Sequence, residues 1–286
     1  MKAISLGWGV QSFTLAAMSA LGDLEPVDVA IHADTTHEAS GTYKFASRWT
    51  PWLEARGVSV VTVRANRHDI LIERSSGTSV PLPAFTRSEP GATILVPLKE
   101  YGWGDDGEAY EIDTGEMIEV PVNINGRINR QCTKDWKIRP MRRWLQSNRD
   151  GQQIEQWLGI SLDEFQRVKD SNVQYITHRW PLIELRMTRD DCQEYLEAHG
   201  LEVPPKSACK FCPFHDMAAW REMKANGGED WQKAVEVDEA IRSVRPPYDL
   251  FLHPARIPLV DVDLRSEQDK GQLSLWDAEC SGICGV

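Results

Sequence analysis

The sequence lacks any apolar run long enough to cross a bilayer. Charge or glycine interrupts each apolar stretch within about ten residues, whereas a membrane-spanning helix needs roughly 20. The first residues, MKAISLGWGVQS, also lack the small-residue cleavage site that is typical of a signal peptide. We therefore expect a cytoplasmic protein with no membrane partner.

Positive charge and cysteine are also scarce. The chain has 32 Lys and Arg against 43 Asp and Glu, a net charge of −11, which argues against a broadly basic surface that coats nucleic acid. It has six cysteines in 286 residues. Because cytosolic thiols stay reduced, we interpret these cysteines as core residues, metal ligands or catalytic thiols.

The first hundred residues alternate between strand and helix patterns. We predict strands at residues 2–6, 27–32 and 58–63, and helices at residues 10–21 and 41–56, the second bent at Pro51. This order is typical of an α/β protein with a doubly wound parallel sheet. From residue 77 to 126 the alternation stops, and short apolar runs with Pro and Gly indicate a β-rich insertion. The insertion is either a lid over a ligand or a decoration of the fold.

Helical and strand patterns then resume. We predict helices at residues 137–148, 162–169, 189–199 and 217–224, strands at 153–158 and 174–177, and irregular chain after Pro246. The resulting domains are a nucleotide-binding domain at 1–185, with its insertion at about 77–126, and a helical, Cys-containing C-terminal region at 186–286.

A glycine-containing turn joins the first predicted strand to the first helix. Backbone N–H groups at such a turn and the helix dipole can bind phosphate, and glycines allow close approach. The candidate phosphate-binding residues are Ser5, Gly7, Gly9, Gln11 and Ser12. The alternative is a tight connection without a ligand.

Polar residues follow the second predicted strand, in the segment HADTTHE. In doubly wound sheets ligands bind at the carboxyl ends of strands, so this segment should lie beside the glycine turn. We expect Asp34 to hold the adenosine and His37 or Glu38 to face the reacting centre. The alternative is a solvated loop before the next helix.

Three cysteines are the preferred metal ligands. Cys209 and Cys212 form a Cys-x-x-Cys knuckle that suits zinc or an iron–sulfur cluster. Cys132 is the best third ligand because its segment, RINRQCTKDWKIRP, carries basic residues that offset thiolate charge. We expect thiolates of low pKa in this basic setting. A structural zinc site is the alternative to a catalytic centre.

The other cysteines have different interpretations. Cys280 and Cys284 lie in the tail ECSGICGV, where either thiol could supply a fourth ligand or carry sulfur. Cys192 lies within a predicted helix, and we expect it to be a core residue.

Residues 127–149 hold a concentration of positive charge. Eight basic residues stand against one acid, Asp135. They could steer a tRNA or DNA substrate, neutralise the phosphates of a nucleotide, or form a solvated helix face. The basic residues are Arg127, Arg130, Lys134, Lys137, Arg139, Arg142, Arg143 and Arg149.

Several segments together resemble a known family. SLGWGVQS resembles the Ser-Gly-Gly-x-Asp-Ser loop of the adenine nucleotide α-hydrolase superfamily, and HADTTHE resembles the acidic segment after its second strand. RQCTKDWKIRP is similar to the Cys-containing segment of phosphoadenylylsulfate reductase-like proteins. GISLDEFQRVKDS, WPLIE and KSACKFCPF resemble the phage and bacterial branch of that group. The resemblance covers most of residues 1–220.

This resemblance implies a fold of the HUP or PP-loop type that binds ATP, or a related adenylyl nucleotide, with Mg²⁺. It implies adenylation of a substrate, release of pyrophosphate, and insertion of sulfur from a [4Fe–4S] cluster on Cys132, Cys209 and Cys212, or from a persulfide on Cys280 or Cys284. Arg167 and Lys137 would stabilise charge on the phosphoryl group.

The chain departs from the family pattern at three places. Trp8 replaces a glycine, Gln11 replaces an aspartate, and Cys132-Thr133 replaces a Cys-Cys pair of some sulfonucleotide reductases. The main hypothesis is therefore an ATP-dependent sulfur transferase. A sulfonucleotide reductase and a zinc-stabilised, non-catalytic nucleotide- or nucleic-acid-binding module are the alternatives, and a homodimer is an option that the sequence leaves open.

Overall fold

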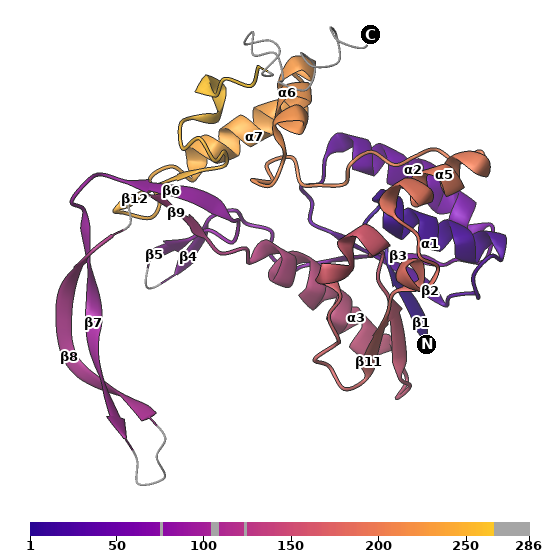
Figure 1. Cartoon of the computed structure of the whole chain (residues 1–286), viewed down its shortest axis with the longest axis horizontal. Helices are drawn as coiled ribbons and strands as arrows, with labels where there is room; N and C mark the ends of the chain where they lie inside the picture. The colour runs from indigo at the N-terminus through magenta and orange to yellow at the C-terminus, as the bar shows by residue number, and fades with distance from the viewer. Residues whose placement is uncertain (75–76, 104–108, 123–124, 266–286) are drawn as a thin grey trace, which may run out of the picture. The chain divides into compact units, whose positions relative to one another are not determined.

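The computed structural model describes residues 1–74, 77–103, 109–122 and 125–265 (Figure 1). The chain divides into two compact units, each assembled from separate segments. Unit 1 comprises Met1–Asp69, Gln131–Cys212 and Gly227–Trp231, and unit 2 comprises Ile70–Arg130, Pro213–Asn226 and Gln232–Val286. The domain boundary expected after residue 185 therefore falls within unit 1, and the insertion belongs to unit 2.

Unit 1 contains a five-stranded, all-parallel sheet. Its order is β11-β10-β1-β2-β3. The chain builds β1, β2 and β3 outward in one direction and then returns to add β10 and β11 on the other side of β1. The point of reversal lies between β1 and β10, as in a doubly wound sheet. The strands are β1 (Lys2–Ser5), β2 (Val29–Asp34), β3 (Val60–Arg64), β10 (Ile154–Trp157) and β11 (Ile176–Arg179).

Helices cover both faces of this sheet. Side chains alternate along a strand, so in β1 Ile4 packs into one core and Ala3 into the other. The Ile4 core includes side chains of α1 (Val10–Leu21), α2 (Ser40–Glu54) and α5 (Arg189–Ala198). The Ala3 core includes Leu145 of α3 (Arg139–Asn148), which follows the π-helix η1 (Thr133–Ile138). Cys192 is fully buried in the first core, which confirms its predicted role.

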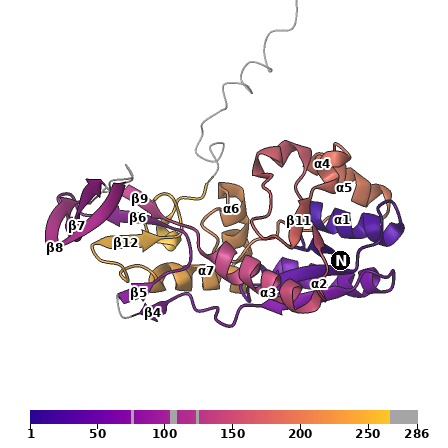
Figure 2. The same ribbon diagram turned by 90° about the horizontal axis from the view of Figure 1, so that it is seen from below.

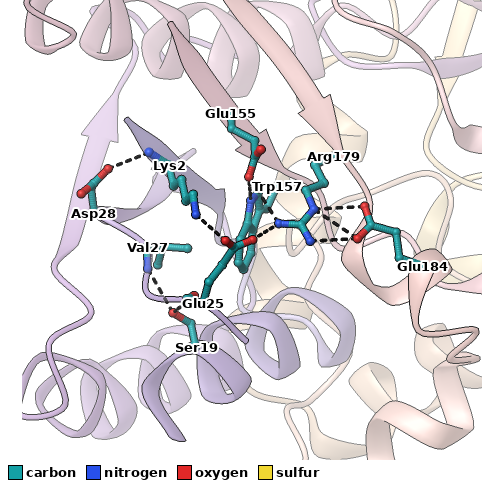
Figure 3. Close-up of polar contacts among 9 residues, drawn as sticks. All are labelled: Lys2, Ser19, Glu25, Val27, Asp28, Glu155, Trp157, Arg179 and Glu184. Atoms are coloured by element: carbon teal, nitrogen blue, oxygen red, sulfur yellow. Dashed lines mark hydrogen bonds and ion pairs between the residues drawn. The ribbon is translucent and has the colours of Figure 1, made fainter. Parts of the chain in front are cut away.

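An ionic network joins the edge strand β11 to its surroundings (Figure 3). The Arg179 guanidinium pairs with Glu184 at 2.9 Å and lies 5.1 Å from the centre of the Trp157 ring on β10. It also pairs with Glu25 and Glu155. These hydrogen-bonded carboxylates raise the pKa of Arg179, although burial opposes them. Arg179 therefore ties the edge strand to β10 and to the loop before β2.

Unit 2 is built mainly of antiparallel strands. One sheet has the order β12-β6-β9, and two hairpins pair β4 with β5 and β7 with β8. This confirms the predicted β-rich insertion, whose role as a lid stays a prediction. The strands are β4 (Ile72–Arg74), β5 (Gly77–Ser79), β6 (Ala84–Ser88), β7 (Thr93–Trp103), β8 (Ala109–Pro121), β9 (Asn125–Ile128) and β12 (Tyr248–Phe251).

The remaining elements are helices, of which α4, α6 and α7 are labelled in Figure 2. None of the helices within the described ranges is both long and apolar enough to cross a membrane. They are η2 (Leu162–Arg167), α4 (Pro181–Glu184), α6 (Met217–Asn226), α7 (Glu229–Ala240) and η3 (Leu259–Asp261).

Candidate functional site

A cavity of about 390 Å³ lies within unit 1 at the carboxyl ends of the parallel strands. Its lining includes Ser5 and Gly7 from the end of β1, His32 from β2, and Gln156 and Gly159 from β10 and the chain that follows it. The cavity thus sits at the point where the strand order reverses, where doubly wound folds bind ligands. Its volume falls in the range of small-molecule sites, about 300–1,000 Å³.

The cavity wall combines apolar and cationic side chains. Three cations, Lys137, Arg142 and Arg167, line it from η1, α3 and η2. Such a mixture suits a ligand with a flat apolar part and several negative charges. The apolar lining consists of Leu6, Ala33, Ile138, Met141, Leu158 and Ile160.

Neutral polar groups complete the wall. His32 Nδ1 lies 3.1 Å from the Leu6 carbonyl oxygen, which can only accept, so Nδ1 carries the proton. Burial lowers the pKa of His32, and the neutral ring leaves Nε2 as an acceptor. Gln156 Nε2 donates to Ser5 Oγ at 2.7 Å. The Thr133 hydroxyl is buried without a hydrogen-bond partner among the described residues, so a ligand acceptor in the cavity would satisfy it.

In the glycine turn, Trp8 adopts a left-handed backbone conformation that favours glycine. Trp8 has φ of 55°, in the left-handed region, and its side chain is buried against Phe13 and Phe45. Gly7 N–H donates to Ser12 Oγ at 3.1 Å, and Ser12 Oγ donates to the Gly9 carbonyl at 3.2 Å. The Ser12 hydroxyl therefore closes the turn.

The first turn of α1 contacts the chain after β10. A Cβ atom on Gly159 would lie 2.7 Å from the Ser12 backbone nitrogen, so only glycine fits there. Gln11 donates from Nε2 to Ser161 Oγ and Glu164 Oε2, both at 3.3 Å. Glu164 in turn accepts from Arg167 Nη1 at 2.6 Å. Of the five predicted loop residues, Ser5 and Gly7 line the cavity, and Gly9, Gln11 and Ser12 are not part of its lining.

Sequence reasoning missed Gly159 as a site residue. The available signal was a glycine directly after the predicted strand at 153–158. A glycine at that position often marks a place where another backbone segment approaches closely.

Asp34 has a different environment from the one expected. Its carboxylate accepts from Thr36 N–H at 2.8 Å, Tyr43 Oη at 2.7 Å and Arg64 Nε at 2.8 Å. Burial would raise the pKa of Asp34, but these hydrogen bonds and the Arg64 charge lower it overall. The Asp34 carboxylate therefore holds the end of β2 through its three hydrogen bonds, and it does not line the cavity.

Glu38 and Lys137 link the cavity to the cysteine segment. Glu38 is buried, and its Oε1 accepts from Lys137 Nζ at 2.9 Å and from Thr35 Oγ1 at 3.0 Å. Thr35 Oγ1 lies 3.5 Å from Cys209 Sγ. The backbone of Glu38 also pairs with Cys209 in an isolated antiparallel bridge. A chain of three contacts thus joins a cavity cation to a thiol.

The glycine turn and the Cys-x-x-Cys segment meet in unit 1. A Cβ atom on Gly9 would lie 2.9 Å from Ser207 Oγ, two residues before Cys209. The ring of His37 lies between Phe211 and Trp136, with ring centres 5.0 and 5.5 Å away. The turn and the Cys-x-x-Cys segment therefore lie close together, although Cys132, Cys209 and Cys212 are not among the residues that line the cavity.

The expected low pKa at Cys209 is wrong. Burial raises the pKa of this thiol to about 12, and the nearby Glu38 carboxylate adds to the effect, which outweighs Lys137. The sequence could not show this, because Glu38 comes from a distant part of the chain.

The three predicted ligands, Cys132, Cys209 and Cys212, do not converge. Within the described residues, no three His, Cys, Asp or Glu side chains form a group that could hold a metal ion. A metal centre on these cysteines therefore stays a prediction. Cys280 and Cys284 lie outside the described residues.

The basic segment at residues 127–149 serves more than one purpose. Lys137 and Arg142 line the cavity, and their role in neutralising a ligand's charge stays a prediction. Arg139 pairs with Asp135 at 2.6 Å on the helix surface. Arg127 and Arg130 belong to unit 2.

Comparison with known proteins gives no family assignment. No protein-family model matches the chain, and no curated protein matches it.

Proposed function

We propose that this protein is an ATP-dependent sulfur transferase with a fold of the PP-loop type. It binds ATP in the cavity of unit 1, adenylates an acceptor and releases pyrophosphate. The observation that carries the proposal is the position of the cavity, at the switch point of the sheet, where three cations line it. The Cys209 segment next to the glycine turn supports the sulfur chemistry.

The lining suggests how the nucleotide would lie. The apolar side chains accept the base, and His32 Nε2 offers an acceptor beside it. Lys137, Arg142 and Arg167 neutralise the phosphates and stabilise the charge that develops during transfer. Mg²⁺, when bound with ATP, neutralises part of the pyrophosphate charge.

The reaction has two displacements. An acceptor oxygen attacks the α-phosphorus, the new O–P bond replaces the bond to the β-phosphate, and pyrophosphate leaves. A cysteine of this chain carries a persulfide, which it gains beforehand when its thiolate takes the outer sulfur of a sulfane-sulfur donor and the donor leaves as a thiol. The terminal sulfur of this persulfide then attacks the activated carbon, and AMP leaves with the oxygen. A reductant of the thiol class cleaves the S–S bond that remains.

Nucleotide binding is the first test. Equilibrium dialysis with labelled ATP and Mg²⁺ should show binding that Lys137→Ala weakens by about tenfold or more, because a charge-assisted contact contributes roughly 1.5–3 kcal/mol. Lys134→Ala is the matched control, because Lys134 is exposed on the same helix and does not line the cavity. Equal affinities for the two variants would refute this placement of the nucleotide.

Turnover is the second test. Pyrophosphate release that depends on added tRNA or DNA supports a transferase. Reduction of adenylyl sulfate without pyrophosphate release would instead identify a sulfonucleotide reductase. A brown protein that absorbs near ~400 nm after anaerobic purification would restore the predicted cluster.

A further inference from the structure

An exposed aromatic ring in unit 2 lies between two guanidinium groups. The Phe214 side chain follows directly after the Cys-x-x-Cys-Pro motif and is 43% exposed. The guanidinium carbons of Arg127 and Arg130 lie 5.6 and 5.4 Å from the centre of its ring. These distances are within the range of cation–π contacts.

Arg127 and Arg130 are both exposed residues. Among the residues that the structure describes, no carboxylate lies within ion-pair distance of Arg127 or Arg130, and neither donates a side-chain hydrogen bond. Two like charges held around one ring repel each other, and they do so in a chain with a net charge of −11. A bound anion would relieve that repulsion.

Three other arginines of unit 2 have structural partners. Arg242 pairs with the buried carboxylate of Asp238, and Arg87 donates to the Arg256 carbonyl at 2.9 Å. Arg256 itself donates to the Thr86 carbonyl at 3.0 Å. Unlike these three arginines, Arg127 and Arg130 flank an exposed aromatic ring and offer their donors to a ligand.

We propose that Arg127, Phe214 and Arg130 form a binding site for single-stranded nucleic acid. An unpaired base stacks on the exposed part of the Phe214 ring or on a guanidinium plane, and the flanking phosphates bind the two arginines. A duplex keeps its bases stacked and offers no ring to Phe214. An acidic peptide would use the arginines but not the aromatic ring.

This inference goes beyond the proposed function, since all three residues belong to unit 2. It names the class of polymer that the protein recognises, and it holds whether or not ATP binds in unit 1. Nucleic-acid binding measured without ATP, and ATP binding measured without nucleic acid, therefore test the two proposals separately.

The test uses fluorescence anisotropy with the full chain and fluorescein-labelled oligo(dT), oligo(U) and a duplex of equal length. Single strands should bind more tightly than the duplex. Phe214→Leu, which keeps an apolar side chain but removes the ring, should weaken single-strand binding by roughly 5- to 150-fold. Arg127→Ala and Arg130→Ala should each lower the slope of log affinity against log salt by about 0.7.

Two matched controls separate the site from general effects. Phe165→Ala removes another exposed phenylalanine, and Arg265→Ala removes an arginine that is already paired with Asp263. Both should bind like the wild type, and the thermal melts of all variants should agree. Equal binding of duplex, unchanged binding by Phe214→Leu, or displacement of the oligonucleotide by polyglutamate at equal charge would each overturn the proposal.

Discussion

Replacing Gly159 by alanine tests the close approach on which the candidate site depends. The added Cβ would lie 2.7 Å from the Ser12 nitrogen, 2.9 Å from Ser12 Cα and 3.0 Å from the Gln11 carbonyl carbon. All three are backbone atoms, so no side chain can rotate away. Overpacking of this kind costs about 1–3 kcal/mol, and we expect about 2–3 kcal/mol here because backbone must move. For a domain of this size the melting temperature should fall by about 4–12 °C.

Differential scanning calorimetry measures this change. Gly41→Ala is the matched control, because a Cβ at Gly41 meets only Pro205, at 3.5 Å, and the residue lies in the first turn of α2. Alanine there should leave the stability unchanged or raise it by up to about 1 kcal/mol. If Gly159→Ala melts at the temperature of Gly41→Ala, the chain after β10 does not press against α1, and the geometry of the cavity described above is wrong.

Three further predictions concern charge and burial in unit 1. Asp34→Asn should lower the free energy of unfolding by about 2 kcal/mol at pH 7, because the Asp34 carboxylate accepts from Arg64 and its side chain is only 5% exposed. Folding lowers the pKa of Asp34, so the wild type itself loses this stabilisation when the carboxylate is protonated. Urea melts should therefore show that the difference between variant and wild type shrinks as pH falls below about 4. Arg179→Met should lower the free energy of unfolding by about 1–3 kcal/mol, because Glu155 and Glu184 lose their cationic partner while Glu25 keeps Lys2. Added salt should recover part of the loss, and a salt-independent loss would point to packing on Trp157 instead. Cys192 should resist alkylation by iodoacetamide until the protein unfolds, because its thiol is buried and burial raises its pKa to about 12. If mass spectrometry finds Cys192 alkylated in the native protein, its place in the core is wrong.

Local sequence signals were enough to predict the main elements of unit 1. The helix predicted at residues 10–21 agrees with α1, because Gly9 precedes it and Gly22 ends it in the left-handed conformation. The five parallel strands were also located, and β2 and β3 had the strongest signal because they are mainly apolar segments between turn signals.

Other elements were missed for identifiable reasons. α7 has a largely polar sequence, EDWQKAVEVDEA, whose apolar residues are too few to suggest a buried face. β12 follows Pro246 and Pro247, which suggested irregular chain, yet it pairs with β6 across more than 150 residues of sequence. Sequence periodicity does not report such a distant partner.

Only part of the site was predicted, because some of its contacts join segments that are distant in the sequence. The position of Ser5 and Gly7 followed from their place after the first strand, whereas the effect of Glu38 on Cys209 depends on a tertiary contact. Trp8 appeared to be a departure from a glycine pattern, but the structure accommodates it by burying the ring while the backbone stays left-handed.

The discontinuous build of unit 1 constrains how the protein can be made in the cell. The central strand β1 ends at residue 5, but its neighbour β10 begins at residue 154. At a synthesis rate of about 5–20 residues per second, the nascent β1 waits roughly 8–30 s with one edge unpaired. During this interval the emerging chain offers apolar surface to chaperones or to other nascent chains. Slower growth at reduced temperature, with abundant chaperone, should therefore raise the yield of correctly folded material.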